Sequence, residues 1–246
     1  EPDNTIYRNT ILYENISGTV GAKISLSEHS TLKSNIGTAW RAPNVAELYR
    51  FGQHAFFLEY GLWRYTINEG SDFVSTSQGI LDQSDRVVPS EKGYKWITTY
   101  SHKGDDLQWE LTGYINYINN YIFSRPAGIT RTPRGFFIFF IYDQADALFM
   151  GLDLDGKWKH SAHITSEIRG SFLWSKQINP SDFLAAQPTP NLSYTCTYSP
   201  AIEWLQEAKL QLRIDYTLQA YQHPRTISIE EFLFAAQEGI NRFSDD

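Results

Sequence analysis

The chain has 246 residues, of which 41% are hydrophobic and 15% aromatic, and its net charge is -7 at pH 7. This length suffices for a large core, and the mildly acidic balance does not suggest a nucleic-acid partner. Since Cys196 is the sole cysteine, the chain has neither an intrachain disulfide nor a thiolate metal cluster. The longest apolar run, FFIFFIY at 136–142, is shorter than the roughly 18 residues that a transmembrane helix requires.

Apolar and polar residues alternate in eight segments, which predicts eight β-strands. In chain order the segments are 16–26, 31–40, 94–101, 107–118, 148–159, 162–174, 192–198 and 207–218. In the last segment, for example, Leu210, Leu212 and Ile214 alternate with Gln211 and Arg213. Most segments have about 10 to 12 residues, whereas soluble strands average about 5 to 6 and a strand that crosses a bilayer needs about 9 to 11. Strand length therefore favours a membrane protein.

The connections between these segments alternate between short and long. The short connections are 27–30, 103–106, 159–162 and the somewhat longer 199–206, and the long ones are 42–93, 119–147, 175–190 and 219 to the end. A soluble half-buried strand also has one apolar and one polar face, but a soluble sheet has no reason to place every long loop at one end. An outer-membrane barrel has short periplasmic turns and long extracellular loops, so the pattern indicates such a barrel.

Aromatic residues give a further indication. Seven of them share the apolar parity of their strands and lie toward strand ends, namely Trp40, Trp96, Tyr117 and Trp174 toward the predicted outer rim and Trp109, Trp158 and Tyr198 toward the inner rim. Trp and Tyr concentrate where lipid meets water. Core aromatics of a β-sandwich would explain the shared parity, but not the placement at strand ends.

Four segments resemble, in the same order, motifs of TonB-dependent outer-membrane receptors. The segment GTAWRAPNVAELYRFGQH (37–54) contains an Arg-Ala-Pro triplet, an acidic-Leu-Tyr element and a Gly-x-His. PSEKGY (89–94) is similar to the Glu-Lys at the start of a family strand, and LTGYINYINNYI (111–122) is similar to a family hairpin strand. YDQADALFMGLDLDG (142–156) has Asp153 where the acidic residue of the fourth motif usually lies.

This resemblance implies an all-β fold, an antiparallel transmembrane β-barrel with long extracellular loops, of whose 22 strands about eight lie in this chain. Residues 1–246 are then expected to be part of a single barrel domain, with the plug domain and the closing C-terminal strands not in this chain. The expected location is the bacterial outer membrane, in contact with the lipid bilayer and lipopolysaccharide. The expected function is TonB-coupled uptake of a scarce nutrient, a ferric siderophore or another iron chelate, with the TonB complex contacted through the plug.

Charged residues on the polar parity of the strands predict a network inside the barrel. Its expected members are Arg41, Glu110, Glu167, Arg169, Arg213 and Asp215. Arg41 is expected to pair with a carboxylate such as Glu110, Glu167 or Asp215, and a direct contact with the ligand is the alternative. Pro43 cannot donate a ladder hydrogen bond, so the strand is expected to leave the sheet at Arg-Ala-Pro.

Four residues of the predicted outer loops are candidates for ligand binding: His54, Arg125, Arg131 and Arg134. Three guanidinium groups within ten positions are suited to an anionic chelate, because arginine donates two hydrogen bonds to one carboxylate. An ordinary solvated loop is the alternative. His54 suits an iron or haem ligand only by residue type, and His160 and His163 have no nearby carboxylate or cysteine that would complete a zinc site.

Catalytic motifs of the GxSxG, P-loop, HExxH and GxGxxG types are absent from the sequence, so neither an enzyme nor a bound cofactor or metal is expected. Two other classes of protein stay open at this point. One is a small eight-stranded outer-membrane barrel with a structural or adhesive role, and the other is a soluble β-sandwich that binds carbohydrate.

Overall fold

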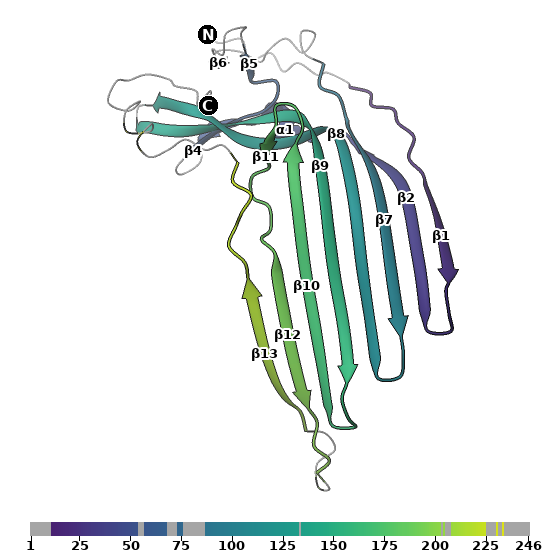
Figure 1. The fold of residues 1–246 in the computed structure, drawn as a ribbon. Helices are drawn as coiled ribbons and strands as arrows, with labels where there is room; N and C mark the ends of the chain where they lie inside the picture. The colour runs from purple at the N-terminus through teal and green to yellow at the C-terminus, as the bar shows by residue number, and fades with distance from the viewer. Residues whose placement is uncertain are drawn as a thin grey trace.

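The computed structural model describes residues 11–53, 57–67, 73–75, 87–132, 134–202, 204, 208–224, 230 and 233. Its main feature is one antiparallel sheet in which neighbouring strands follow one another along the chain (Figure 1). The wall strands are β1 (Thr19–Ser25), β2 (Ser30–Arg41), β7 (Glu91–Lys103), β8 (Leu107–Thr132), β9 (Gly135–Lys159), β10 (Ile164–Gln177), β12 (Asn191–Tyr198) and β13 (Leu210–Thr217). All eight predicted strands are therefore present, and the predicted all-β, antiparallel architecture is confirmed.

Short elements lie between β2 and β7. They are α1 (Val45–Tyr49), β3 (Phe51–Gln53), β4 (Phe57–Tyr60), β5 (Tyr65–Ile67) and β6 (Phe73–Ser75), and a further short strand, β11 (Asp182–Phe183), pairs with β10. β3 and β4 form a hairpin, and β4 also pairs in parallel with β9. Among the described residues, no helix is long and apolar enough to span a membrane.

The strand register gives the wall one apolar and one polar face. One row across neighbouring strands joins Val20, Ile36, Trp96, Ile115, Met150 and Trp174. A row on the opposite face joins Lys23, Lys33, Thr99, Thr112, Asp153 and Ser171. Since side chains alternate with a period of two, a slip of one residue between strands would mix these faces, so the hydrophobic pattern fixes the register.

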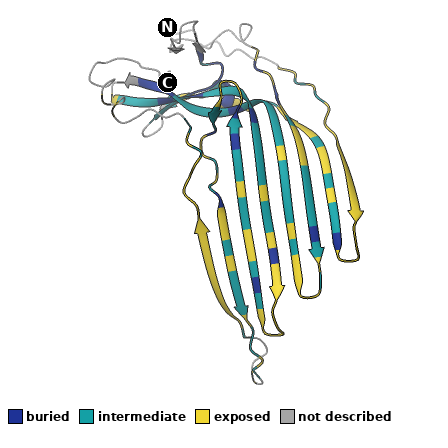
Figure 2. Cartoon of the chain, viewed as in Figure 1, coloured by how far each residue is buried: buried dark blue, intermediate teal, exposed yellow. Residues whose placement is uncertain are grey.

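The apolar face is bare. Leu210, Leu212 and Ile214 are 70%, 62% and 56% exposed, and in the part of the chain that the structure describes no second layer covers the wall (Figure 2). The hydroxyls of Ser34 and Thr98 on this face bond to each other at 3.0 Å, and the Trp96 indole donates to Ser34. A β-sandwich would bury this face beneath another sheet, so the soluble alternative is wrong.

The apolar face has the height of a membrane. Trp158 lies opposite Leu107 at the start of β8, and Tyr117, where β8 passes the loop edge of the wall, lies opposite Leu148. The ten steps from Leu107 to Tyr117 correspond to about 33 Å along a strand, or about 25 Å at a tilt of roughly 40°. Of the predicted outer rim, Trp40 and Tyr117 mark the edge of the wall, whereas Trp96 and Trp174 lie two residues farther in, in the row of Ile115 and Met150. The predicted inner rim of Trp109, Trp158 and Tyr198 is present at the other edge.

The wall has a turn edge and a loop edge. Tight turns close the β1–β2, β7–β8 and β9–β10 hairpins at the turn edge, whereas the long connections lie at the loop edge (Figure 1). The described strands form an open sheet in which β1 and β13 each pair with one wall strand and lie at opposite sides. A small closed barrel of these eight strands is therefore not what the chain forms.

The prediction of a loop at 119–147 is wrong, because β8 and β9 continue through it as one long hairpin. Two β-bulges, at Ile118/Tyr121 and Pro126/Gly128, interrupt the alternation that would have indicated strands. The apolar run at 136–142 lacks alternation for a further reason. Near its end Phe139 and Ile141 are buried by the preceding loop, so this part of β9 does not alternate like a half-exposed strand.

The hydrophobic core of the described chain lies at the loop edge and not in the wall. One cluster contains Leu48, Leu62, Trp63, Val88 and Ile122, and a second contains Tyr60, Tyr65, Ala127, Phe139 and Ile141. These residues join α1, β4 and 62–65 to the part of the β8–β9 hairpin beyond Tyr121, and β3 is attached through its pairing with β4. We call this assembly the loop platform.

Candidate functional site

An ion cluster on the polar face connects the wall to the loop platform. Arg41, the last residue of β2, donates to Glu91 through Nε at 2.8 Å and Nη2 at 2.7 Å, and to both oxygens of Glu47 through Nη1 at 2.9 and 2.8 Å. The Arg41 side chain is 43% exposed, whereas Glu47 and Glu91 are each 10% exposed. The guanidinium is thus the reachable part of a cluster whose carboxylates are covered.

Local sequence places each member of this cluster. Pro43 takes the chain out of β2, and Asn44 caps α1 by accepting the backbone N–H of Glu47 at 2.9 Å. Glu47 completes the capping box by accepting the backbone N–H of Asn44 at 2.8 Å. The same carboxylate therefore both caps the helix and pairs with Arg41, so α1 is held beside the polar face.

Glu91 extends the cluster to a third wall strand. Its Oε1 accepts the backbone N–H of Ile122 at 2.7 Å, just after the first bulge of β8. The hydrogen bonds to Glu91, together with the Glu47 carboxylate, raise the pKa of Arg41 above its ordinary value. The cluster thus ties β2, β7, β8 and α1 together, and its arginine stays charged.

Aromatic rings lie beside the cluster. Because the bulge at Ile118/Tyr121 adds one residue to β8, Tyr121 and Phe123 share the polar face with Phe149. The Tyr121 ring stacks on Phe123 at 6.1 Å and meets Phe149 edge to face at 5.3 Å. Burial raises the pKa of the Tyr121 hydroxyl, and the Glu91 carboxylate raises it further. We call these three residues the mouth patch.

A second aromatic contact continues the mouth patch along the wall. The ammonium group of Lys95 lies 5.1 Å from the centre of the Tyr114 ring. Tyr114 covers Gly151 of β9, because a Cβ at Gly151 would lie 2.1 Å from the ring. The polar face near the loop edge therefore offers ring faces and hydrogen-bonding groups, and its described arginines are already paired.

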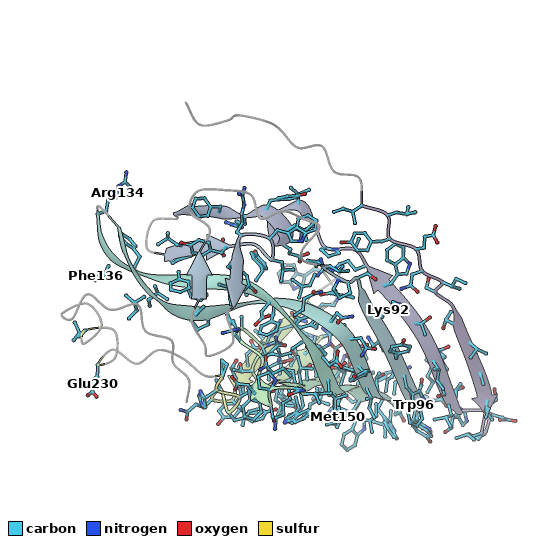
Figure 3. All side chains as sticks on the ribbon, turned by 90° about the horizontal axis from the view of Figure 1, so that it is seen from above. Lys92, Trp96, Arg134, Phe136, Met150 and Glu230 are labelled. Atoms are coloured by element: carbon cyan, nitrogen blue, oxygen red, sulfur yellow. The ribbon has the colours of Figure 1, made fainter. Side chains whose placement is uncertain are left out.

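The structure does not join the predicted arginine trio into one clamp. Arg125 donates to Asp143 at 2.7 Å and lies opposite Ile141, whereas Arg131 lies opposite Phe136, about 16 to 20 Å farther along the hairpin. Arg134 lies at the tip of the hairpin with Phe136, far from Trp96 and Met150 of the wall (Figure 3). His54 lies outside the described residues.

The predicted partners of Arg41 are wrong. Glu110 accepts from Ser101 near the turn edge, while Arg169 pairs with Asp155 and Glu167, and Arg213 pairs with Asp215. These side chains pair with a neighbour in register or with a residue two positions away on the same strand. Arg41 lies at the opposite edge of the wall from Glu110. The predicted network is therefore a set of separate local pairs.

Sequence reasoning missed the pairing of Arg41 with Glu47 and Glu91, and it missed the mouth patch. The Asn-x-x-Glu spacing of Asn44 and Glu47 is a capping-box signal and could have placed Glu47 beside the end of β2. The pairing of Arg41 with Glu91 requires the register of β2 and β7, and the position of Tyr121 requires the bulge. Neither the register nor the bulge is visible in the order of the residues.

The wall is an open sheet with a polar face and an apolar face whose height matches the hydrocarbon core of a membrane. These features define this chain as part of a membrane β-barrel. A family model described as "TonB dependent receptor-like, beta-barrel" matches residues 2–228. The chain therefore belongs to the TonB-dependent receptor β-barrel family. A comparison with curated protein sequences finds no match.

Solved structures share the fold. The "Copper transporter OprC" is 19% identical, with a TM-score of 0.55, and the similarity covers 74% of this chain and 24% of that one. The siderophore receptor PirA from Pseudomonas aeruginosa is 17% identical, with a TM-score of 0.52, and the similarity covers 82% and 34%. The chain thus spans about a quarter to a third of these receptors, and the likeness is one of fold.

Proposed function

We propose that this chain forms part of the barrel wall of an outer-membrane receptor that imports a ferric siderophore or another iron chelate by TonB-coupled transport. The two-faced wall carries the proposal, because an apolar band about 25 Å high beside a polar face suits a strand layer between lipid and a wet cavity. Family membership supports the coupling to TonB. Lipopolysaccharide and phospholipid would then contact the apolar face.

The side chains at the loop edge favour one chemical class of ligand. Arg41 is shared by two carboxylates and Arg125 is paired with Asp143, so neither adds a free positive charge. The mouth patch adds three rings to the polar face. Aromatic pairs stabilise one another by about 0.5 to 1.5 kcal/mol beyond their burial, so we propose a chelate that presents aromatic groups to this patch.

The ligand roles of His54, Arg131 and Arg134 stay proposals. A position at the hairpin tip would let Arg131 and Arg134 meet an anionic chelate before it reaches the mouth patch. The three arginines would then act in succession, with Arg125 available only when Asp143 releases it.

The proposal is tested by uptake of radioactive iron in a strain that lacks the receptor and is complemented with the full-length protein. We expect uptake from at least one ferric chelate to require both the receptor and TonB. In a Tyr121→Leu, Phe149→Leu variant, uptake from chelates with aromatic groups should fall roughly threefold to tenfold. Ile115→Ala, on the apolar face, is the matched control and should leave uptake unchanged.

Two results would contradict the proposal in different ways. If copper salts but no ferric chelate entered through the receptor, the iron assignment would be wrong while the transport role would stand. Equal losses for chelates with and without aromatic groups would reject the ring contact alone.

A further inference from the structure

Two turns at the turn edge have the same sequence pattern and the same hydrogen bonds. Ser27-Glu28-His29 precedes β2, and Ser161-Ala162-His163 precedes β10. In each turn the serine hydroxyl accepts the backbone N–H of the histidine, at 3.3 Å for His29 and 3.2 Å for His163. The flanking backbone bonds also correspond, from Leu26 to Ser30 at 2.8 Å and from His160 to Ile164 at 2.9 Å.

Each histidine makes two bonds to the end of the next strand in the sheet. The carbonyl of His29 accepts the backbone N–H of Lys103 at 2.8 Å, and Nδ1 of His29 lies 3.1 Å from the Lys103 carbonyl. The carbonyl of His163 accepts the N–H of Ser199 at 2.8 Å, and its Nδ1 lies 2.9 Å from the Ser199 carbonyl. Because a carbonyl oxygen only accepts, Nδ1 carries the hydrogen in both rings.

The ring N–H replaces a main-chain donor. In an antiparallel ladder the backbone N–H of His29 would bond to the Lys103 carbonyl, but the turn directs this N–H to Ser27. The Lys103 carbonyl would therefore be left without a protein donor. The imidazole supplies the donor from the same residue, so the ladder continues for one more pair while the chain turns.

The β7–β8 turn lies between these two turns in the sheet, and we call it the middle turn. It provides a comparison because it has no Ser-x-His sequence. The carbonyl of Asp106 in the β7–β8 turn accepts the N–H of Lys159 at 2.7 Å, which is the same backbone contact. An ionised aspartate has no hydrogen to donate, so Asp106 makes no equivalent of the second bond. The histidine is thus an addition to a contact that all three turns share.

We propose that Ser-x-His is a clasp motif in this protein, in which His29 and His163 are positioning residues that fasten their turns to the ends of β7 and β12. The clasps fix the strand ends at the turn edge, beyond Trp109, Trp158 and Tyr198. Ser27 and Ser161 are part of the motif, because each hydroxyl accepts the backbone N–H of the histidine. The carbonyl of Lys103 or Ser199 is then left for the imidazole to bind. The zinc site considered for His160 and His163 has no support, since His160 Nε2 bonds to Ser166 at 2.8 Å and His163 to Ser199.

The test is amide hydrogen exchange of the full-length receptor in detergent, resolved to single residues. His29→Ala should speed exchange at Lys103 roughly threefold to tenfold, the range for loss of one neutral hydrogen bond, and leave Ser199 unchanged. His163→Ala should have the converse effect. His29→Asn should restore protection at Lys103, because the amide nitrogen of asparagine lies close to the position of Nδ1 and also donates.

The middle turn makes the test independent of any loss of folding in the alanine variants. Asp106→His should slow exchange at Lys159 by a similar factor, and exchange at Ile115 in the middle of the wall should not change in any variant. Unchanged exchange at Lys103 in His29→Ala, or equal exchange in the Ala and Asn variants, would overturn the clasp. A gain of protection in Asp106→His would support it even if an alanine variant failed to fold.

Discussion

At the scale of residues, a few side chains replace main-chain groups where the ladder stops. Gln222 is a second example, because its Oε1 accepts the Ser175 N–H at 2.6 Å while its Nε2 donates to the Leu173 carbonyl at 2.6 Å. Among the described strands, β10 has no ladder partner on the β12 side between Ser171, where its pairing with β12 ends, and Lys176, where its pairing with β11 begins. One amide side chain therefore provides the donor and the acceptor of a missing peptide group, and its local effect matches that of His29 and His163.

Arg41 is the residue with the largest predicted effect on the loop edge. Arg41→Lys should open the platform locally, because a single ammonium group cannot reproduce the fork that reaches Glu47 and Glu91 together. We expect a loss on the order of 1 to 3 kcal/mol of local stability, measured as faster amide exchange at Leu48 and Ile122.

The control for Arg41 is Arg213→Lys, which changes a pair that is exposed on both sides. Exposed ion pairs contribute about 0 to 1 kcal/mol, so exchange near β13 should hardly change. If Arg41→Lys had the same small effect as Arg213→Lys, the ion cluster would not hold α1.

At the scale of elements, the loop after β2 and the β8–β9 hairpin form one body. β4 pairs with β9 at four consecutive positions, from Phe57 with Ile138 to Tyr60 with Ile141. α1 meets the following segment through backbone bonds from Leu62 to Glu47 at 2.8 Å and from Trp63 to Leu48 at 3.0 Å. Two connections that are distant in sequence are therefore expected to move together.

Gly61 tests this docking of α1. A Cβ at Gly61 would lie 2.5 Å from the carbonyl carbon and oxygen of Leu48 and 2.7 Å from the Arg50 nitrogen. Since these are backbone atoms, Gly61→Ala should displace α1 and cost about 1 to 3 kcal/mol of platform stability. Limited proteolysis should then cut both the loop after β2 and the hairpin more rapidly.

Gly52→Ala is the matched control, because no atom of the described residues lies within 4 Å of its added Cβ. This variant should be cleaved at the wild-type rate. Faster cleavage of the loop in Gly61→Ala without any change in the hairpin would show that the two connections move separately.

Most of the wall, but little of the loop platform, could be predicted from the sequence. Alternation gives the eight wall strands because lipid and water impose one rule along every strand. The hairpin beyond Tyr117 was not predictable, since two bulges break the alternation and the loop covers Phe139 and Ile141. Arg41 was predictable as a paired residue of the polar face, but Glu91 as its partner depends on the strand register.

At the scale of the whole molecule, the two faces of the wall should tolerate charge very differently. Leu111 and Thr112 are neighbours in the middle of β8, and they face Leu154 and Asp153 on opposite sides of the sheet. Leu111→Arg should cost about 2 to 4 kcal/mol, the range for arginine facing lipid at mid-depth. Thr112→Arg should be nearly neutral, because the new guanidinium would lie beside Asp153.

Urea titration of the full-length receptor refolded into vesicles, followed by the gel shift of heated against unheated samples, measures this difference. Equal losses for Leu111→Arg and Thr112→Arg would show that both faces meet the same medium. That result would contradict the assignment of the apolar face to lipid.

The separation of the core from the wall has a consequence for how the molecule responds to its surroundings. Packing within the loop platform removes apolar surface from water, so its strength depends on temperature and on solutes such as urea. The wall has no interior of this kind, and its cohesion follows the thickness and fluidity of the bilayer. Cooling, or a change of acyl chain length, should therefore act selectively on one of the two parts, and a single melting temperature would not describe both.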